Sequence, residues 1–188
     1  DKLIDTAEAA RGDGLQVELG GNGIQQASQD PGGGPSEFIG FIAAAIVLAI
    51  AFGSLWATLL PLISAILALG CGLSLNGLLA HAIDIATFAP TLATLIGLGV
   101  GIDYSLFVVT RHRNAIKAGR DPEAACVRAL NTSGRAVLFA GGTVIVALLG
   151  LFVLGISFLN GVAVASALVV LVTMTAAVTL IPALLGII

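Results

Sequence analysis

Charged side chains are scarce in this sequence. Asp, Glu, Lys and Arg together make up 10% of its 188 residues, whereas soluble domains carry about 25%. Three long stretches contain no charge at all: Phe38–Ala80, Ile85–Ile102 and Ala136–Ile188. These runs are longer than a buried core helix requires, and a membrane span needs about 20 apolar residues. The composition therefore excludes an ordinary water-soluble globule and indicates a protein of the lipid bilayer.

Residues suited to catalysis, metal binding or redox chemistry are also few. Cys71 falls in a predicted span and Cys126 in a polar segment, so we interpret both as free thiols. His81 and Asp84 share a short link, but two ligands without others at metal-ligand spacing indicate solvated residues. No nucleophile–base pair or cysteine-rich cluster occurs in the sequence. We therefore expect neither an enzyme nor a protein that binds a metal, a cofactor or nucleic acid.

The apolar runs predict an all-α membrane protein built as a bundle of five transmembrane helices. Gly53–Ser54 and Gly155–Asn160 are expected to form tight turns between neighbouring spans. Pro61 falls in the first turn of the second span and Pro90 near the start of the third, where a missing N–H costs little. The expected spans are residues 38–52, 58–79, 87–110, 136–154 and 161–185.

Residues 1–35 differ from the rest of the chain because they are polar. Residues 3–10 have the apolar spacing of a short amphipathic helix, and residues 15–19 alternate as in a strand. A glycine-rich linker, DPGGGPS, follows at 30–36. One helix and one strand cannot bury a core, so we expect 1–35 to be the α/β end of a larger extracytoplasmic domain in a chain that is a fragment. An independent soluble tail is the alternative. Residues 36–188 form the predicted transmembrane domain.

The basic residues are concentrated in one predicted loop, residues 111–135. This loop contains only two acidic residues, and Asp121-Pro122-Glu123 predicts the start of a short helix lying on the membrane face. Cytoplasmic loops are enriched in Lys and Arg, so the loop and the C-terminus should be cytoplasmic and the N-terminus extracytoplasmic. Binding of anionic lipid headgroups is an alternative role for this loop. Its cations are Arg111, Arg113, Lys117, Arg120, Arg128 and Arg135.

A single charge, Asp103, interrupts the apolar stretch 85–110. An ionisable group near the centre of a spanning helix costs roughly 2.5–3.5 kcal/mol and usually marks function. Hydrocarbon disfavours the charged form of a carboxyl group, so we expect Asp103 to bind and release a proton. Tyr104 offers a hydroxyl that can bridge to a neighbouring carboxylate, and Gly99, one turn earlier, leaves room beside Asp103. The alternative is a structural aspartate that never titrates.

The glycine-rich run GLGVG at 97–101 is not a nucleotide-binding loop. Ile102 occupies the position of the third glycine of such a motif, and no strand precedes the run. Gly97, Gly101 and Ser105 instead recur every four residues and form a stripe of small residues. Such a stripe lets a second helix approach closely. The simplest interpretation is that these residues serve helix packing and have no further function.

The stretch GLGVGIDYSLFVVTRHR at 97–113 resembles the fourth transmembrane helix of MMPL-type (mycobacterial membrane protein large) transporters of the resistance–nodulation–division superfamily. The resemblance extends over Glu37–Ile188, and the GRAVLF sequence at 134–139 favours the N-terminal of two six-helix halves. The matching residues include Gly97, Gly99, Gly101, Asp103, Tyr104, Leu106, Phe107, Arg111, Gly119, Glu123, Ala124 and the run 132–137.

This resemblance implies spans two to six of one half of a proton-driven exporter in the bacterial inner membrane. Asp103 and Tyr104 would relay protons together with an Asp-Tyr pair of a second half, which is absent from this sequence. The implied partners are membrane lipids, that second half, protons and a lipid or other hydrophobic substrate. The alternatives are a sterol-sensing-like membrane sensor or scaffold, since such domains resemble the same helical half, and an oligomeric channel.

Overall fold

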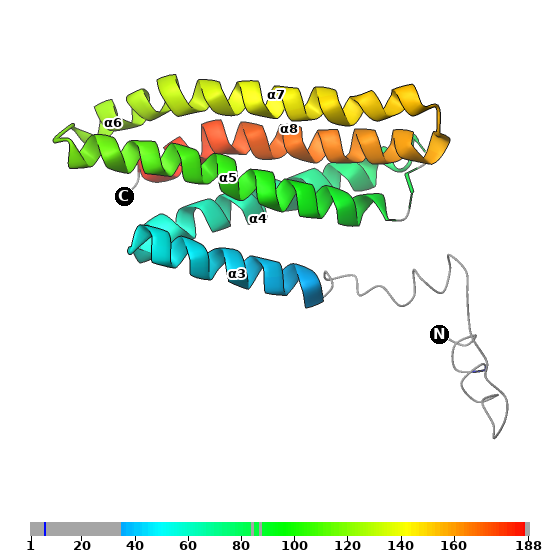
Figure 1. Cartoon of the computed structure of the whole chain (residues 1–188), viewed down its shortest axis with the longest axis horizontal. Coiled ribbons are helices and arrows are strands. Elements are labelled where there is room, and N and C mark those ends of the chain that lie inside the picture. Colours follow the sequence, from blue (N-terminus) through cyan, green and yellow to red (C-terminus); the bar gives the residue numbers. More distant parts are fainter. Residues whose placement is uncertain (1–5, 7–34, 84, 87, 187–188) are drawn as a thin grey trace. The chain divides into compact units, whose positions relative to one another are not determined.

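The computed structural model describes residue 6 and residues 35–83, 85–86 and 88–186, in two compact units that comprise Asp1–Phe41 and Ile42–Ile188. The helix and strand predicted within 1–35 lie outside the described residues, so the α/β character of this segment and the domain boundary stay predictions. Every regular element of the described residues is helical (Figure 1). The elements are α3 (Pro35–Phe52), α4 (Leu55–Leu79), α5 (Ala89–Lys117), α6 (Pro122–Ala129), η1 (Leu130–Gly134), α7 (Arg135–Leu149), η2 (Gly150–Leu154) and α8 (Ser157–Leu185).

Four helical segments among the described residues are long and apolar enough to cross a membrane, rather than the five expected. The apolar part of α3, Ile39–Phe52, is shorter than the others. At about 1.5 Å per residue it falls short of a hydrocarbon core about 30 Å thick. The four segments are Trp56–Leu79, Ala89–Lys117, Pro122–Leu154 and Ser157–Leu185.

Helix α8 is the centre of the second unit, because α4, α5 and α7 all pack against it. Figure 1 shows α8 running alongside α5 and α7. A further contact joins α4 to α5, while α6 packs on α5. Since lipid is as apolar as these side chains, van der Waals fit rather than water exclusion holds such helices together.

The prediction of a loop at 111–135 is wrong, because α5 continues to Lys117 and the next helix, α6, begins at Pro122. Residues 111–117 carry cations but neither glycine nor proline, so nothing in them stops a helix. Gly119 ends α5 with φ +80°. Its N–H donates to the Ile116 carbonyl and the Arg120 N–H donates to Ala115, which is the Schellman pattern of a glycine-terminated helix.

The predicted start of a short helix at Asp121 is confirmed. The Asp121 carboxylate accepts a hydrogen bond of 3.2 Å from the Glu123 N–H, and Pro122 occupies the first helical position. Ala125 and Ala129, on the expected apolar side, are buried. A five-residue π-helical segment, η1, then joins α6 to α7 without a loop.

Two further boundaries differ from the sequence expectation. Helix α4 begins at Leu55 rather than at 58, so Pro61 lies inside the helix and not in its first turn. Helix α8 begins at Ser157, and the turn expected over 155–160 is limited to Gly155, at φ +66°, and the extended Ile156. In both places the helix starts two residues after a glycine with positive φ, Gly53 or Gly155.

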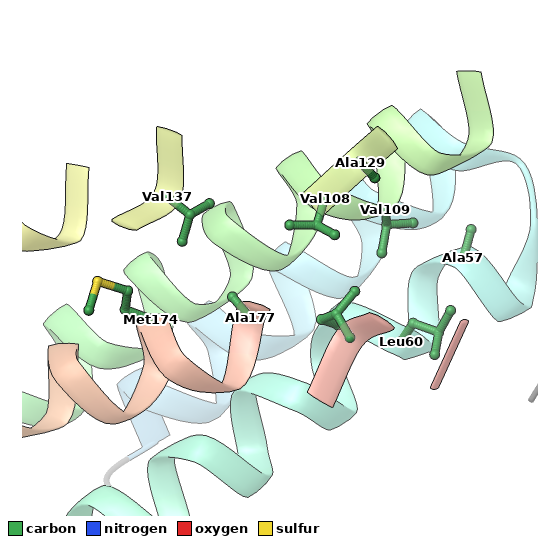
Figure 2. Close-up of a cluster of buried hydrophobic side chains, with 9 residues drawn as sticks. Ala57, Leu60, Val108, Val109, Ala129, Val137, Met174 and Ala177 are labelled. Carbon is green, nitrogen blue, oxygen red and sulfur yellow. The ribbon is translucent and has the colours of Figure 1, made fainter. Parts of the chain in front are cut away.

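A cluster of buried apolar side chains fixes α4, α5, α7 and α8 to one another near the C-terminal end of α5. Figure 2 shows these side chains distributed along the space between the helices. The buried members are Ala57, Leu60, Val108, Val109, Ala129, Val137, Met174, Ala177 and Ile181.

Candidate functional site

Asp103 lies at the middle of α5, on the face of that helix that the described residues leave exposed. Leu95, Gly99, Asp103 and Phe107 follow one another at four-residue spacing along this face, and Phe107 is 54% exposed. We call these four residues the Asp103 face. No hydrogen bond or salt bridge joins the Asp103 carboxylate to another residue of the described ranges. The chain thus presents this carboxylate outward instead of enclosing it.

The opposite side of α5 carries the small residues and packs into the bundle. A Cβ on Gly97 would overlap the Val169 side chain of α8, whereas a Cβ on Gly101 would lie 3.5 Å from Ala65 and from Thr173. Ser105, one turn further, is 1% exposed. These positions allow α4 and α8 to approach the α5 backbone on the side away from Asp103.

Gly99 behaves differently from the two glycines of the packed side. No atom lies within 4 Å of the position that its Cβ would occupy. Gly99 therefore leaves free space one helical turn from Asp103, on the same face. This space is large enough to admit a side chain or a water next to the carboxylate.

Tyr104 does not share the Asp103 face, since consecutive helical residues point about 100° apart. Its ring is partly buried and packs against the apolar cluster of Figure 2. The tyrosine is therefore anchored in the bundle while the neighbouring carboxylate points outward.

The six cations of the predicted loop lie on helices and one turn, all at the same end of the bundle. Arg113 donates through Nη1 to the Phe52 carbonyl at 3.0 Å, and its guanidinium lies 5.2 Å from the centre of the Phe52 ring. Arg111 donates to the Thr132 hydroxyl at 3.4 Å. The other four are exposed. We call this end, marked by Arg111, Arg113, Lys117, Arg120, Arg128 and Arg135, the basic end.

A cavity of about 250 Å³ lies at the basic end and reaches Phe107 of the Asp103 face. Phe107, Thr110 and Asn114 line it from α5, and Thr132 and Ser133 line it from the π-helical segment η1. Phe107 lies one turn from Asp103 on the same face. Polar side chains thus extend from the basic end toward the carboxylate.

His81, one of the two residues considered for metal binding, does not line this cavity. His81 interacts through Nδ1 with the Gly77 carbonyl at 2.9 Å, while Asp84 lies outside the described residues. Within the described ranges, no group of three potential ligands is close enough to hold a metal ion. Cys71 and Cys126 are both free thiols, as predicted.

Two buried polar residues were not identified from the sequence. Asn76 of α4 donates through Nδ2 to the Ala165 carbonyl of α8 at 3.2 Å. His112 of α5 is 8% exposed, and its Nε2 has no hydrogen-bond partner in the described part of the chain. An asparagine within a long apolar run is a visible signal, but the cations on either side of His112 favour an exposed position in the sequence.

Comparison with known proteins gives one family. The model of the MMPL family matches residues 1–188. Membrane protein YdfJ of Bacillus subtilis is 43% identical over 185 residues, which are 98% of this chain and 25% of the relative. In Mycolicibacterium smegmatis, the mycolic acid-containing lipids exporter MmpL11 is 36% identical over 141 residues (75% of this chain, 15% of the relative). The trehalose monomycolate exporter MmpL3 is 36% identical over 143 residues (76% and 14%). The chain therefore spans at most a quarter of the length of these relatives.

Proposed function

The chain belongs to the MMPL family, and we propose that it acts as part of a transporter that uses proton flow to export lipids or other hydrophobic compounds. It is a multi-pass membrane protein with relatives named as lipid exporters. Energy coupling requires a group within the membrane that takes up and releases protons. The proposal therefore depends on identifying that group.

Asp103 is the observation that carries the proposal. It is the sole acidic residue of α5, a helix of 29 residues, and it lies at the middle of that helix. A charged carboxylate in hydrocarbon is costly unless it is paired or hydrated. Protonation removes this cost, so alternating between the two forms can couple proton flow to helix movement. Tyr104 would orient or bridge the relay through its hydroxyl.

The Asp103 face is suited to a partner helix rather than to lipid. Gly99 leaves open space beside the carboxylate, and no described residue pairs with Asp103. We propose that the Asp103 face contacts a second six-helix half with its own Asp-Tyr pair. In that arrangement the two carboxyl groups and the two tyrosine hydroxyls would form hydrogen bonds with one another inside the bundle.

The cavity between Thr110, Asn114 and Ser133 supports a route for protons to the basic end. Polar side chains of this kind can hold a chain of waters, although Phe107 stands between them and Asp103. We propose that the basic end is cytoplasmic, because Lys and Arg accumulate on that side of membrane proteins. Protons entering from the outside would then leave Asp103 through this cavity.

Replacement of Asp103 by Asn in the full-length natural protein tests the proposal. The amide keeps the shape of the side chain but cannot carry a proton. Lipids released to the cell exterior would be measured by mass spectrometry in cells that lack the native gene, with and without a protonophore. We expect Asp103→Asn and protonophore treatment each to abolish export, at unchanged protein level in the membrane.

The matched control is Glu123→Gln, which makes the same chemical change at an exposed residue of α6. This control should export like the wild type. Undiminished export by Asp103→Asn at normal proton-motive force would refute the proposed role of the carboxylate.

A further inference from the structure

A second cavity, of about 430 Å³, lies at the basic end between α4, α5 and α8, and Asp103 is not among its lining residues. This volume falls within the range of roughly 300–1,000 Å³ that is typical of small-molecule sites. The cavity and the residues around it play no part in the proposed proton relay. We therefore consider separately what it binds.

One wall of the cavity is apolar and the rim is cationic. Trp56, Leu60 and Leu185 supply apolar surface, whereas Arg113 and Lys117 supply positive charge. No acidic side chain lines the cavity. Trp56 is 64% exposed, so it is open to a ligand. A ligand complementary to this lining has an anionic group next to an apolar chain.

The Arg113 guanidinium is held in place before any ligand binds. One of its N–H groups donates to the Phe52 carbonyl, and the cation lies over the Phe52 ring. A guanidinium has five N–H donors, so the remaining donors can reach a phosphate oxygen without further ordering. Lys117 follows one turn later and adds a second, exposed charge.

His112 supplies an independent indication of a ligand. It lines the same cavity, is 8% exposed, and has an Nε2 atom without a partner among the described residues. A buried polar nitrogen without a hydrogen bond is costly and calls for an explanation. A water held by a bound phosphate group would satisfy this nitrogen.

The position of the rim along α5 matches the depth of lipid headgroups. Lys117 follows Asp103 by fourteen positions, which corresponds to about 21 Å of helix. Half of the hydrocarbon core is about 15 Å thick, so an Asp103 near the midplane places Lys117 at headgroup level. The apolar wall then extends from the headgroup toward the acyl region.

We propose that this cavity binds an anionic phospholipid of the leaflet at the basic end. The phosphate is held by Arg113 and Lys117, and one acyl chain lies against Trp56, Leu60 and Leu185. The apolar wall favours a lipid over a free phosphate ion, which would leave that wall uncovered. This site is distinct from the Asp103 face, so a failed proton relay would leave the lipid site intact, and the converse also holds.

Trp56, the one tryptophan of these 188 residues, provides a direct test in the full-length protein once any tryptophan outside them is replaced by phenylalanine. The purified protein would be placed in phosphatidylcholine vesicles that contain 10 mol% of either brominated phosphatidylglycerol or brominated phosphatidylcholine, and tryptophan fluorescence recorded. Bromine quenches only at close range. We expect phosphatidylglycerol to occupy the site roughly 25-fold more strongly than phosphatidylcholine, since each of the two cations favours an anionic lipid about fivefold. Equal quenching by the two lipids would overturn the proposal without the need for any variant.

Two variants then locate the site. Lys117→Gln should reduce the preference for phosphatidylglycerol by about fivefold, and Arg113→Gln/Lys117→Gln should abolish it. Arg128→Gln is the matched control, because Arg128 is an exposed cation of the basic end that lines a different cavity. An equal loss in Arg128→Gln would show general surface attraction and refute a specific site. Displacement of the brominated lipid by millimolar inorganic phosphate would likewise contradict a lipid ligand.

Discussion

Gly97 of α5 lies so close to Val169 of α8 that a Cβ at position 97 would overlap the valine side chain. The same valine lies 3.1 Å, through Cγ2, from the Cβ position of Gly72 in α4. One β-branched residue thus fills the space that two glycines on neighbouring helices leave open. The absence of side chains at 72 and 97 sets how closely the three helices approach.

Substitution of the glycines of α5 should therefore have graded effects on stability. Gly97→Ala forces α5 and α8 apart or distorts Val169, and overpacking of this kind costs about 1–3 kcal/mol. Gly101→Ala should be tolerated, because its Cβ would make ordinary contacts at 3.5 Å. Gly99→Ala should be neutral or stabilising by up to about 1 kcal/mol, since alanine is the better helix former. Unfolding by SDS in mixed micelles measures all three, and equal losses at 97 and 99 would contradict the observed packing.

Asn76 links α4 to α8 through its hydrogen bond to the Ala165 carbonyl. Asn76→Ala removes this bond in a buried position, and interhelical bonds in membrane proteins contribute about 0.6 kcal/mol on average and up to about 1.7. We expect a loss in this range in the same unfolding assay. Gly77→Ala is the adjacent control, because no atom lies within 4 Å of its Cβ position. A stability unchanged by Asn76→Ala would show that the bond contributes nothing.

Gly119 ends α5 in the left-handed region at φ +80°. A non-glycine residue there costs about 1–2 kcal/mol, so Gly119→Ala should destabilise the turn between α5 and α6. Asparagine enters this region more readily, and Gly119→Asn should lose less. Hydrogen exchange of the amides of Ala115–Arg120 would report the local opening. Faster exchange in the asparagine variant than in the alanine variant would be inconsistent with a backbone cause.

The proposed orientation predicts which residues are accessible from outside the cell. His81→Cys and Ala118→Cys would each be introduced into the full-length protein after removal of its native cysteines, Cys71 and Cys126 among them. Both positions are exposed, on opposite ends of the bundle. A membrane-impermeant maleimide should label position 81 in intact cells, and position 118 only after the membrane is opened. The reverse pattern would place the basic end outside.

Local sequence rules predicted the features that depend on neighbouring residues alone. The cap formed by Asp121 and the position of Pro90 at the start of α5 follow from hydrogen-bonding and steric rules within one helical turn. At the C-terminal end of α5 the prediction was wrong because hydropathy had been used to end the helix. Arg111 and Lys117 leave the hydrocarbon but remain helical, because charge ends a membrane span and not an α-helix.

From the amino-acid sequence alone it follows that the chain is a helical membrane protein with a single carboxylate, Asp103, within α5. Which side of each helix is packed depends instead on how the helices fit together in three dimensions. Helices α4, α5 and α8 are apolar around most of their circumference, so hydrophobic periodicity cannot distinguish a packed face from a lipid-facing one. Steric fit makes that choice, as at Gly97 and Val169, and it leaves Asp103 on the open face and His112 in a buried position.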